Sequence, residues 1–215
     1  MSTGKMVKIY LYTRFERFWH WLQALLIFML LLTGFEVHGT FSLFGFQRAV
    51  ELHNFFGLSW IILFVFIVFW VFTTGEWRQY IPTTKKLFAV MRYYSSGIFK
   101  GEPHPVKKSS RAKHNPLQRL TYLGLTAVLL SLQMFTGFLY YMYNDWAVWG
   151  LSFLGLGFLA IVHLACAFLI LSFVVVHIYM TTTGHTIGAH IAAMFSGWEE
   201  VEEGEEEDWE IRQRR

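Results

Sequence analysis

The sequence contains little cysteine, little proline and few charged residues. Cys166 is the one cysteine among 215 residues. A single cysteine excludes an internal disulfide, a Cys-x-x-Cys-His haem attachment and a cluster held by four cysteines of this chain. A cofactor would therefore depend on histidine, methionine or carboxylate ligands. Charged residues make up 15% of the chain and hydrophobic residues 54%, whereas a soluble domain carries about 25% charged residues.

Long apolar runs account for this composition. The four runs cover approximately Phe18–Phe35, Phe55–Thr73, Leu117–Tyr143 and Leu154–Met180. Each is close to the roughly 20 residues that a helix needs to cross the hydrocarbon core of a bilayer. The first run ends without a small-x-small cleavage site, so we expect an uncleaved first span. The sequence therefore predicts an all-α, integral membrane four-helix bundle.

The basic residues indicate the orientation of the spans. Lysine and arginine concentrate before the first run and in the long segment between the second and third runs. The link between the first two runs contains only Arg48, and the link between the last two contains neither lysine nor arginine. Because cytoplasmic segments of membrane proteins are enriched in these residues, we expect both termini and the middle segment to be cytoplasmic.

Two further stretches predict short helices on the inner membrane surface. Apolar and basic residues interleave between Leu87 and Phe99, and a second apolar stretch runs from His185 to Trp198. Such patterns are typical of interfacial helices. Residues 1–198 are thus predicted to form the membrane domain. Residues 199–215 are an acidic tail, which we expect to be disordered.

The histidines within the spans provide the strongest functional indication, because ionisable residues in a membrane are costly. His163 and His177 both lie in the fourth run and are 177 − 163 = 14 residues apart. In a helix this spacing is about 21 Å along the axis and about 40° short of four full turns. Both imidazoles therefore point to one side of the helix, at two depths.

Partners at matching depths follow from the alternating direction of the spans. His20 near the start of the first span is level with His177, and His53 at the start of the second span is level with His163. Two facing imidazoles suit a six-coordinate haem iron, whereas zinc would lack half of its tetrahedral ligands. The sequence predicts an inner haem between His20 and His177 and an outer haem between His53 and His163. Gly34, which is 14 residues after His20, would lie level with the outer pair, where a porphyrin edge needs room.

Other interpretations of these residues stay open. A lone intramembrane histidine is more often a packing or proton-pathway residue than a metal ligand, and small residues are common where membrane helices cross. A transporter or a passive membrane anchor is therefore the alternative from another functional class. The triplet Thr33-Gly34-Phe35 recurs as Thr136-Gly137-Phe138, but both spans run outward, so this echo is not the inverted repeat typical of transporters.

Several motifs together resemble a known family. They are Arg17-Phe-Trp-His20-Trp, Leu32-Thr-Gly-Phe35, Glu51-Leu-His53-Asn and the pair His163 and His177. This pattern resembles the di-haem cytochrome b subunits of membrane-bound formate dehydrogenases, nickel–iron hydrogenases and thiosulfate reductases. The resemblance covers all four spans, roughly residues 14–182, and is specific as a pattern rather than in any single motif.

The resemblance implies a multi-pass subunit of the bacterial or archaeal cytoplasmic membrane with two b-type haems. A periplasmic metalloenzyme, iron–sulfur or multihaem cytochrome subunit would exchange electrons with the outer haem. A quinone, menaquinone or ubiquinone, would react near the inner haem. A single-haem or quinone-independent relay is the alternative within electron transfer.

The resemblance also indicates residues around the cofactors. Asn115 and Gln118 match an Asn-x-x-Gln segment that contacts quinone in the formate dehydrogenase relatives. An N-cap at Asn115 followed by a proline at the first helical position explains Asn115 equally well. Arg17 is a candidate partner of a haem propionate, although the positive-inside distribution also accounts for it.

The sequence contains no nucleophile–base constellation, phosphate-binding glycine loop or nucleic-acid-binding module. We therefore expect a non-catalytic subunit of a larger oxidoreductase, without a nucleic-acid partner. Its basic segment would face anionic lipid headgroups.

Overall fold

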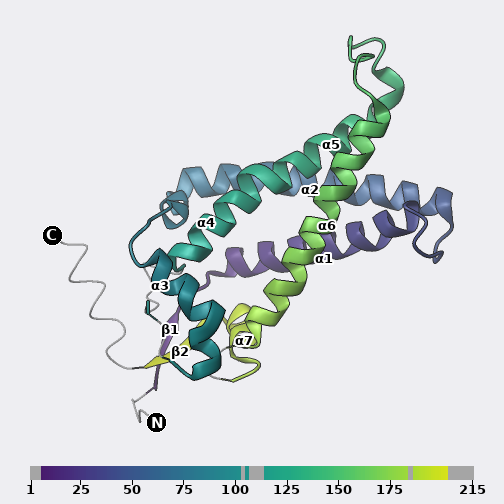
Figure 1. Ribbon diagram of the computed structural model, residues 1–215. Coiled ribbons are helices and arrows are strands. Elements are labelled where there is room, and N and C mark those ends of the chain that lie inside the picture. Colours follow the sequence, from purple (N-terminus) through teal and green to yellow (C-terminus); the bar gives the residue numbers. More distant parts are fainter. Residues whose placement is uncertain (1–5, 103–104, 107–113, 184–185, 203–215) are drawn as a thin grey trace. The chain divides into compact units, whose positions relative to one another are not determined.

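A computed structural model describes residues 6–102, 105–106, 114–183 and 186–202 of the chain. The described part is mostly helical and contains one pair of short strands (Figure 1). The main elements are β1 (Met6–Tyr10), α1 (Arg14–Val37), α2 (Phe46–Thr74), α3 (Leu87–Arg92), α4 (Pro116–Gly124), α5 (Ser131–Tyr141), α6 (Leu156–Thr181), α7 (Ala189–Ser196) and β2 (Trp198–Glu202).

Four helices are long and apolar enough to span a bilayer, as the sequence predicts. They are α1, α2, α6 and the continuous helix Pro116–Tyr141. This third helix comprises α4 and α5, joined by one π-helical segment, Leu125–Leu130. The predicted limits differ most at α2, which begins at Phe46 rather than at Phe55. The first turns of α2 contain the polar residues Gln47, Arg48 and Glu51. A prediction from apolar runs therefore begins the span after these turns.

Local side-chain hydrogen bonds mark the starts of two spans. At α1, the Thr13 hydroxyl accepts from the Glu16 backbone N–H at 3.3 Å, and the Glu16 carboxylate accepts from the Thr13 N–H at 2.7 Å. At α4, Asn115 and Gln118 form the same reciprocal arrangement. Such capping boxes satisfy backbone donors that have no partner inside the helix.

The described chain divides into two compact units. The four-helix unit comprises Phe18–Val71 and Thr126–His177. The strand unit comprises the N-terminal segment to Arg17, the segment Phe72–Leu125 and the C-terminal segment from Ile178. Three stretches far apart in the sequence are therefore parts of one unit.

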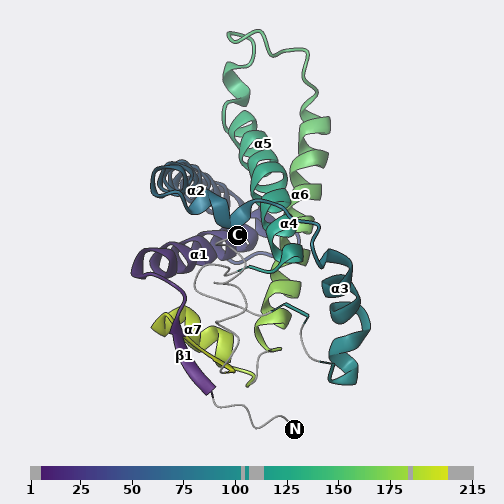
Figure 2. The ribbon, with the colours of Figure 1, turned by 90° about the vertical axis from the view of Figure 1, so that its left-hand side faces the viewer.

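The four-helix unit contains most of the length of the spans. Its α5 and α6 lie side by side and are joined by a hairpin connection (Figures 1 and 2). Trp146 in this connection is buried, and its indole N–H donates to the Leu139 carbonyl at 2.9 Å. Leu139 and Leu159 pack with Trp146 in one cluster. These contacts hold the end of α5 against the start of α6.

A buried carboxylate organises the connection between α1 and α2. Glu36 is 4% exposed, and its Oε1 accepts from the backbone N–H groups of Leu43, Phe44 and Gly45 at 2.7–2.8 Å. These bonds turn the chain back toward α2. A glutamate near the end of an apolar helix is thus explained by the loop that it organises.

The strand unit is built around an antiparallel pairing of β1 with β2, in which Tyr10 lies opposite Trp198. The buried side chains of Ile9 and Leu11 form its apolar cluster. The short helix α7 precedes β2, and the Gly197 carbonyl between them accepts from the backbone N–H groups of Leu11 and Tyr12. The N-terminal segment is therefore tied to the C-terminal one.

Both short helices expected from the amphipathic stretches are present. The first begins as α3 and continues through a π-helical turn and a 3₁₀ turn to Lys100. The second is α7. The predicted acidic tail begins differently, because Glu199–Glu202 belong to β2. The rest of that tail, residues 203–215, lies outside the described residues.

Gly197→Ala is expected to destabilise the strand unit. Gly197 has a φ of 88°, which costs a residue with a side chain roughly 1–2 kcal/mol. Its added Cβ would also lie 2.6 Å from Tyr10 Cε2 and 2.7 Å from the Tyr12 carbonyl oxygen. The thermal unfolding midpoint of the detergent-solubilised protein measures the effect. Gly101→Ala is the matched control, since its φ is 68° and no atom lies within 4 Å of the added Cβ. An equal decrease of the unfolding midpoint in the two variants would show that the contacts around Gly197 add nothing to the cost of its positive φ.

Candidate functional site

The four histidines predicted from the spans all belong to the four-helix unit. His20 lies on α1, His53 on α2, and both His163 and His177 on α6. The ring centroids of His20 and His177 are 6.1 Å apart, and those of His53 and His163 are 6.3 Å apart. The structure therefore brings together the same two pairs that the depths of the residues predict.

The ring separations can be compared with the centroid separation expected for two imidazoles that bind one metal ion. Two metal–nitrogen bonds of about 2 Å each, with about 1 Å from each nitrogen to its ring centre, give a centroid separation of about 6 Å. Both observed separations fit this value. His20 Nδ1 is also buried and has no hydrogen-bond partner among the described residues. The geometry thus suits one metal ion per pair.

The ligand set of each pair favours haem over a bare metal ion. Within the described part of the chain, no group of three or more histidine, cysteine, aspartate or glutamate side chains could hold a metal. Two protein nitrogens leave a tetrahedral zinc half-coordinated. They complete the coordination of a haem iron, whose other four ligands are porphyrin nitrogens. The residues present therefore fit a b-type haem at each pair.

Two threonine hydroxyls lie at hydrogen-bond distance from the rings of the His53–His163 pair. The Thr33 hydroxyl lies 3.0 Å from His53 Nδ1, and the Thr136 hydroxyl lies 2.9 Å from His163 Nδ1. Both threonines are buried, with exposures of 0% and 3%. Thr33 on α1 contacts His53 on α2, and Thr136 on α5 contacts His163 on α6. Thr33 and Thr136 are thus direct polar neighbours of the two rings.

A glycine follows each of these threonines and lies directly against the same ring. A Cβ on Gly34 would lie 3.0 Å from His53 Cε1, and one on Gly137 would lie 3.1 Å from His163 Cε1. Real Cβ atoms are rarely so close to another group, so each glycine lets the imidazole approach the neighbouring helix backbone. The space beside Gly34, expected from the sequence to admit a porphyrin edge, is occupied in the structure by the His53 ring.

Gln133 contacts the other nitrogen of His163. Its amide nitrogen lies 3.1 Å from His163 Nε2. An amide N–H donates, so this contact requires a lone pair on Nε2. A lone pair serves one partner at a time, and metal binding at Nε2 would therefore require the Gln133 amide to leave this position.

The His20–His177 pair has aromatic rather than polar neighbours. Trp21 meets His20 edge-on at a centroid distance of 5.1 Å, and Phe173 stacks on His177 at 5.7 Å. Among the described residues, no side chain is hydrogen-bonded to a ring nitrogen of His20 or His177. The two pairs therefore share their ring separation but differ in their hydrogen bonding.

The other predicted site residues belong to the strand unit, with Arg17 at its boundary. An Arg17 guanidinium N–H donates to the Phe195 carbonyl of α7. The Asn115 side-chain oxygen accepts from the Gln118 N–H at 2.9 Å, and the Gln118 side-chain oxygen accepts from the Asn115 N–H at 3.0 Å. The structure thus gives Asn115 and Gln118 the capping role described above. A propionate contact for Arg17 and quinone contacts for the two amides stay predictions.

Aromatic hydroxyl groups surround the start of α4. The His114 ring lies 5.4 Å from the Tyr80 ring and 5.0 Å from the Tyr122 ring. The Tyr94 hydroxyl accepts from the Asn115 amide at 3.3 Å. Burial, with the Glu16 carboxylate as the second cause, raises the pKa of Tyr80 to about 12. The Tyr80 hydroxyl therefore keeps its proton at neutral pH and can act as a hydrogen-bond donor.

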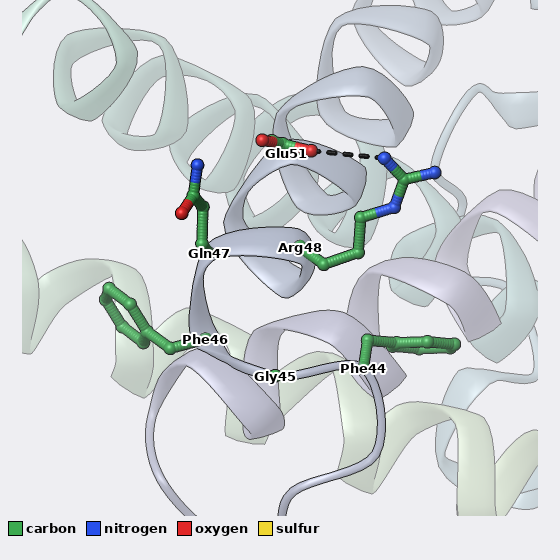
Figure 3. Close-up of a pocket in the computed structure, with 6 residues that line it drawn as sticks. All are labelled: Phe44, Gly45, Phe46, Gln47, Arg48 and Glu51. Carbon is green, nitrogen blue, oxygen red and sulfur yellow. Dashed lines mark hydrogen bonds and ion pairs between the residues drawn. The ribbon is translucent and has the colours of Figure 1, made fainter.

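A shallow pocket of about 400 Å³ opens at the start of α2 (Figure 3). The Arg48 guanidinium and the Glu51 carboxylate pair across it at 3.2 Å. Phe44 and Phe46 point to opposite sides of the loop that borders it. The four histidines of the spans do not line this pocket, so it is separate from the site described above.

Sequence reasoning overlooked the residues that hold the histidines. The sequence pattern does not mark Thr33, Thr136, Gly137 and Gln133 as parts of a site. The available indication is the repeated Thr-Gly-Phe triplet, which by itself indicates only internal repetition. The role of the triplet depends on which helices are neighbours, because the threonine and glycine of each triplet contact a histidine of another helix.

Comparison with known proteins identifies the family. Residues 11–197 match the family described as prokaryotic cytochrome b561. The putative cytochrome YdhU of Escherichia coli (strain K12) is similar, with 32% identity over 146 residues that cover 64% of this chain. These residues cover 55% of the relative, so the chain spans about half the length of the curated relative that it matches. The predicted resemblance to cytochrome b subunits is confirmed, and the chain belongs to the prokaryotic cytochrome b561 family of membrane cytochromes.

Proposed function

We propose that this protein is a membrane electron-transfer subunit that holds two b-type haems. It connects a redox partner at the outer face of the cytoplasmic membrane with quinone near the inner face. The observation that carries this proposal is the presence of two pairs of facing imidazoles, one at each of two levels of α6. Their ring centroids are 6.1 and 6.3 Å apart. When bound, haem supplies one-electron redox chemistry at its iron.

The histidines define the two cofactor levels. His163 and His177 are 14 residues apart on one helix, which is about 21 Å along its axis. His20 on α1 and His53 on α2 each complete one level. A single helix therefore contributes a ligand to both sites, and this keeps the distance between the levels constant. Proton-relay or packing histidines of a transporter would not need this pairing at two depths.

The composition of the strand unit supports the proposed orientation. This unit contains the N-terminal segment, the basic segment between α2 and α4, and the C-terminal segment. The positive-inside rule assigns the first two to the cytoplasmic face, and the four spans between the N-terminal and C-terminal segments return the C-terminal segment to the same face. The connection between α1 and α2 and the connection between α5 and α6 both belong to the four-helix unit. We place these two connections at the outer face.

Quinone binding is proposed at the start of α4. The capping box uses the side-chain oxygens of Asn115 and Gln118, but the Gln118 amide nitrogen takes no part in it. This N–H group and the protonated Tyr80 hydroxyl are of the type that donates to a quinone carbonyl. Reaction of quinone near the cytoplasmic-side haem follows from the family resemblance and from the orientation proposed above.

Substrate chemistry is assigned to a partner, since the sequence contains no catalytic constellation of its own. A periplasmic metalloenzyme, iron–sulfur or multihaem cytochrome subunit fits the redox role of the outer haem. Lipid surrounds the four spans, whose outward side chains are apolar.

Replacing one histidine is expected to remove one haem and leave the other. His20→Ala and His177→Ala should each lower the haem content from two to one per chain, and so should His53→Ala and His163→Ala. Variants of the same pair should lose the same spectral component, because each haem needs both axial ligands. A pyridine haemochrome count with a reduced-minus-oxidised spectrum of the purified protein measures both quantities. His38→Ala is the control, since the His38 side chain is exposed and its ring contacts the Thr40 hydroxyl of the same loop.

Two haems in all four variants would exclude these histidines as ligands. One haem in the wild-type protein would support the single-haem relay. No haem in folded wild-type protein supplied with haem would support a transporter or a passive anchor.

The quinone contacts can be separated from the helix cap by substitutions that keep the capping oxygen. Asn115→Asp and Gln118→Glu retain an acceptor for the capping box but lose the amide N–H groups. We expect both haems to stay bound and the rate of haem oxidation by a soluble quinone to fall at least about tenfold, an energy of about 1.4 kcal/mol. Stopped-flow spectroscopy measures this rate. Asn115→Ala should in addition cost about 1 kcal/mol of stability through the lost cap. Unchanged rates in the Asp and Glu variants would leave these residues with a capping role alone.

A further inference from the structure

The two Thr-Gly steps of α1 and α5 repeat one arrangement around the rings of His53 and His163. Each threonine lies at hydrogen-bond distance from Nδ1 of its histidine, at 3.0 and 2.9 Å. Each following glycine lies against Cε1 of the same ring. The arrangement thus occurs at both histidines of one pair. The residues of α1 form it around His53, and those of α5 form it around His163.

The carbonyl oxygens around each threonine hydroxyl indicate which partner donates in these bonds. Thr33 donates to the Met29 carbonyl at 2.7 Å, and Thr136 donates to the Leu132 carbonyl at 2.8 Å. A hydroxyl has one proton, so the threonine oxygen can only accept from the imidazole. Nδ1 of each histidine therefore carries the proton. Nε2 is left with its lone pair, the form in which an imidazole binds a metal.

The contact of Gln133 with His163 agrees with this assignment. The Gln133 amide N–H donates to His163 Nε2 at 3.1 Å, which requires an unprotonated Nε2. The Gln133 amide nitrogen at Nε2 and the Thr136 hydroxyl at Nδ1 are thus consistent with one tautomer of His163.

At the His20–His177 pair, the described residues form no such bonds. Within the described part of the chain, His20 Nδ1 is buried without a partner, and the neighbours of the two rings are Trp21 and Phe173. The two pairs therefore differ in the hydrogen bonding that tunes metal ligands.

We propose that Thr33 and Thr136 are positioning residues that hold His53 and His163 in the Nδ1-protonated form and lower the reduction potential of the haem between them. A ring N–H that donates to an acceptor makes the opposite nitrogen a stronger electron donor. A stronger donor stabilises ferric over ferrous iron, and second-shell hydrogen bonding of this kind sets haem potentials. Because both threonines are buried, water cannot replace the bond, and its effect is not screened.

The asymmetry has a consequence for electron flow. Two such bonds at the His53–His163 pair, and none among the described residues at the His20–His177 pair, give the two haems different ligand strengths and lower the potential of the first relative to the second. This contribution favours electron transfer from the His53–His163 level to the His20–His177 level. The inference rests on the proposed function, since it requires a haem at each pair.

The first test replaces the hydroxyl and keeps the shape. Thr33→Val and Thr136→Val remove the acceptor but retain a branched side chain of similar size. Each variant should keep both haems and shift the reduction equilibrium of the His53–His163 haem about tenfold toward the reduced form, which is 59 mV for one electron. The His20–His177 haem serves as an internal control and should not change. Potentiometric titration of the purified protein, followed in the haem α-bands, measures both midpoints.

Two matched variants separate the hydrogen bond from packing. Thr33→Ser keeps the hydroxyl and should restore the wild-type midpoint. Ser172→Ala removes a hydroxyl of the same unit that donates to the Phe168 carbonyl of its own helix, and it should shift neither midpoint. Loss of the haem in Thr33→Ser as well as in Thr33→Val would overturn the proposal in favour of packing. Unchanged midpoints in both valine variants with two haems bound would overturn it too.

A second test does not require bound haem. Nitrogen-15 NMR of the histidine-labelled, haem-free protein distinguishes the two neutral tautomers. His53 and His163 should be protonated at Nδ1, and Thr33→Val should alter the signals of His53 alone. Protonation of either ring at Nε2 would contradict the proposal. Absence of haem from the wild-type protein would instead contradict the proposed function, so the two failures are distinguishable.

Discussion

The cost of an unpaired polar group in hydrocarbon is the constraint on which this structure depends. The helical backbone satisfies its own N–H and C=O groups within each span. Polar side chains in the spans must find partners as well, and several find them within their own helix: Ser59, Ser172, Thr33 and Thr136 donate to carbonyls one turn earlier. The rings of His53 and His163 instead contact threonines of other helices. These contacts join α2 to α1 and α6 to α5.

The two levels of α6 meet this requirement in different ways. At His163, threonine and glutamine side chains contact both ring nitrogens, and a glycine allows the ring to lie against α5. At His177, the neighbours are the ring of His20 and the stacked ring of Phe173. One level is thus determined by hydrogen bonds and the other by aromatic packing. A haem bound at each level would experience a different second shell, which is the means by which a protein gives two identical cofactors different potentials.

The division into two units corresponds to a division of chemistry. The four-helix unit contains the facing histidines and few charged groups, whereas the strand unit contains the capping amides, the tyrosine hydroxyls and most of the basic residues. Proton-linked chemistry needs groups that can exchange protons with water, and electron transfer between haems needs an apolar, rigid surrounding. The pairing of β1 with β2 holds the N-terminal segment to the C-terminal segment, so the polar unit does not depend on the spans alone for its structure.

Much of this organisation could be predicted from the sequence because it depends on local periodicity. The lengths of the apolar runs determined the four spans, and the 100° rotation per residue determined that His163 and His177 share one side of a helix. The alternating direction of the spans then indicated the depths of His20 and His53. The cap at Asn115 could also be read locally, since Asn-Pro-x-Gln satisfies its own backbone groups.

The tertiary structure alone decided which helix faces are neighbours. Thr33 contacts His53 across 20 residues and Thr136 contacts His163 across 27 residues, and neither contact follows from the phase of a single helix. The antiparallel pairing of β1 with β2 joins segments far apart in the sequence, and such a pairing does not follow from the local periodicity of either segment. The repeated Thr-Gly-Phe triplet was visible in the sequence, but its role became apparent only when the helices that its side chains contact were known.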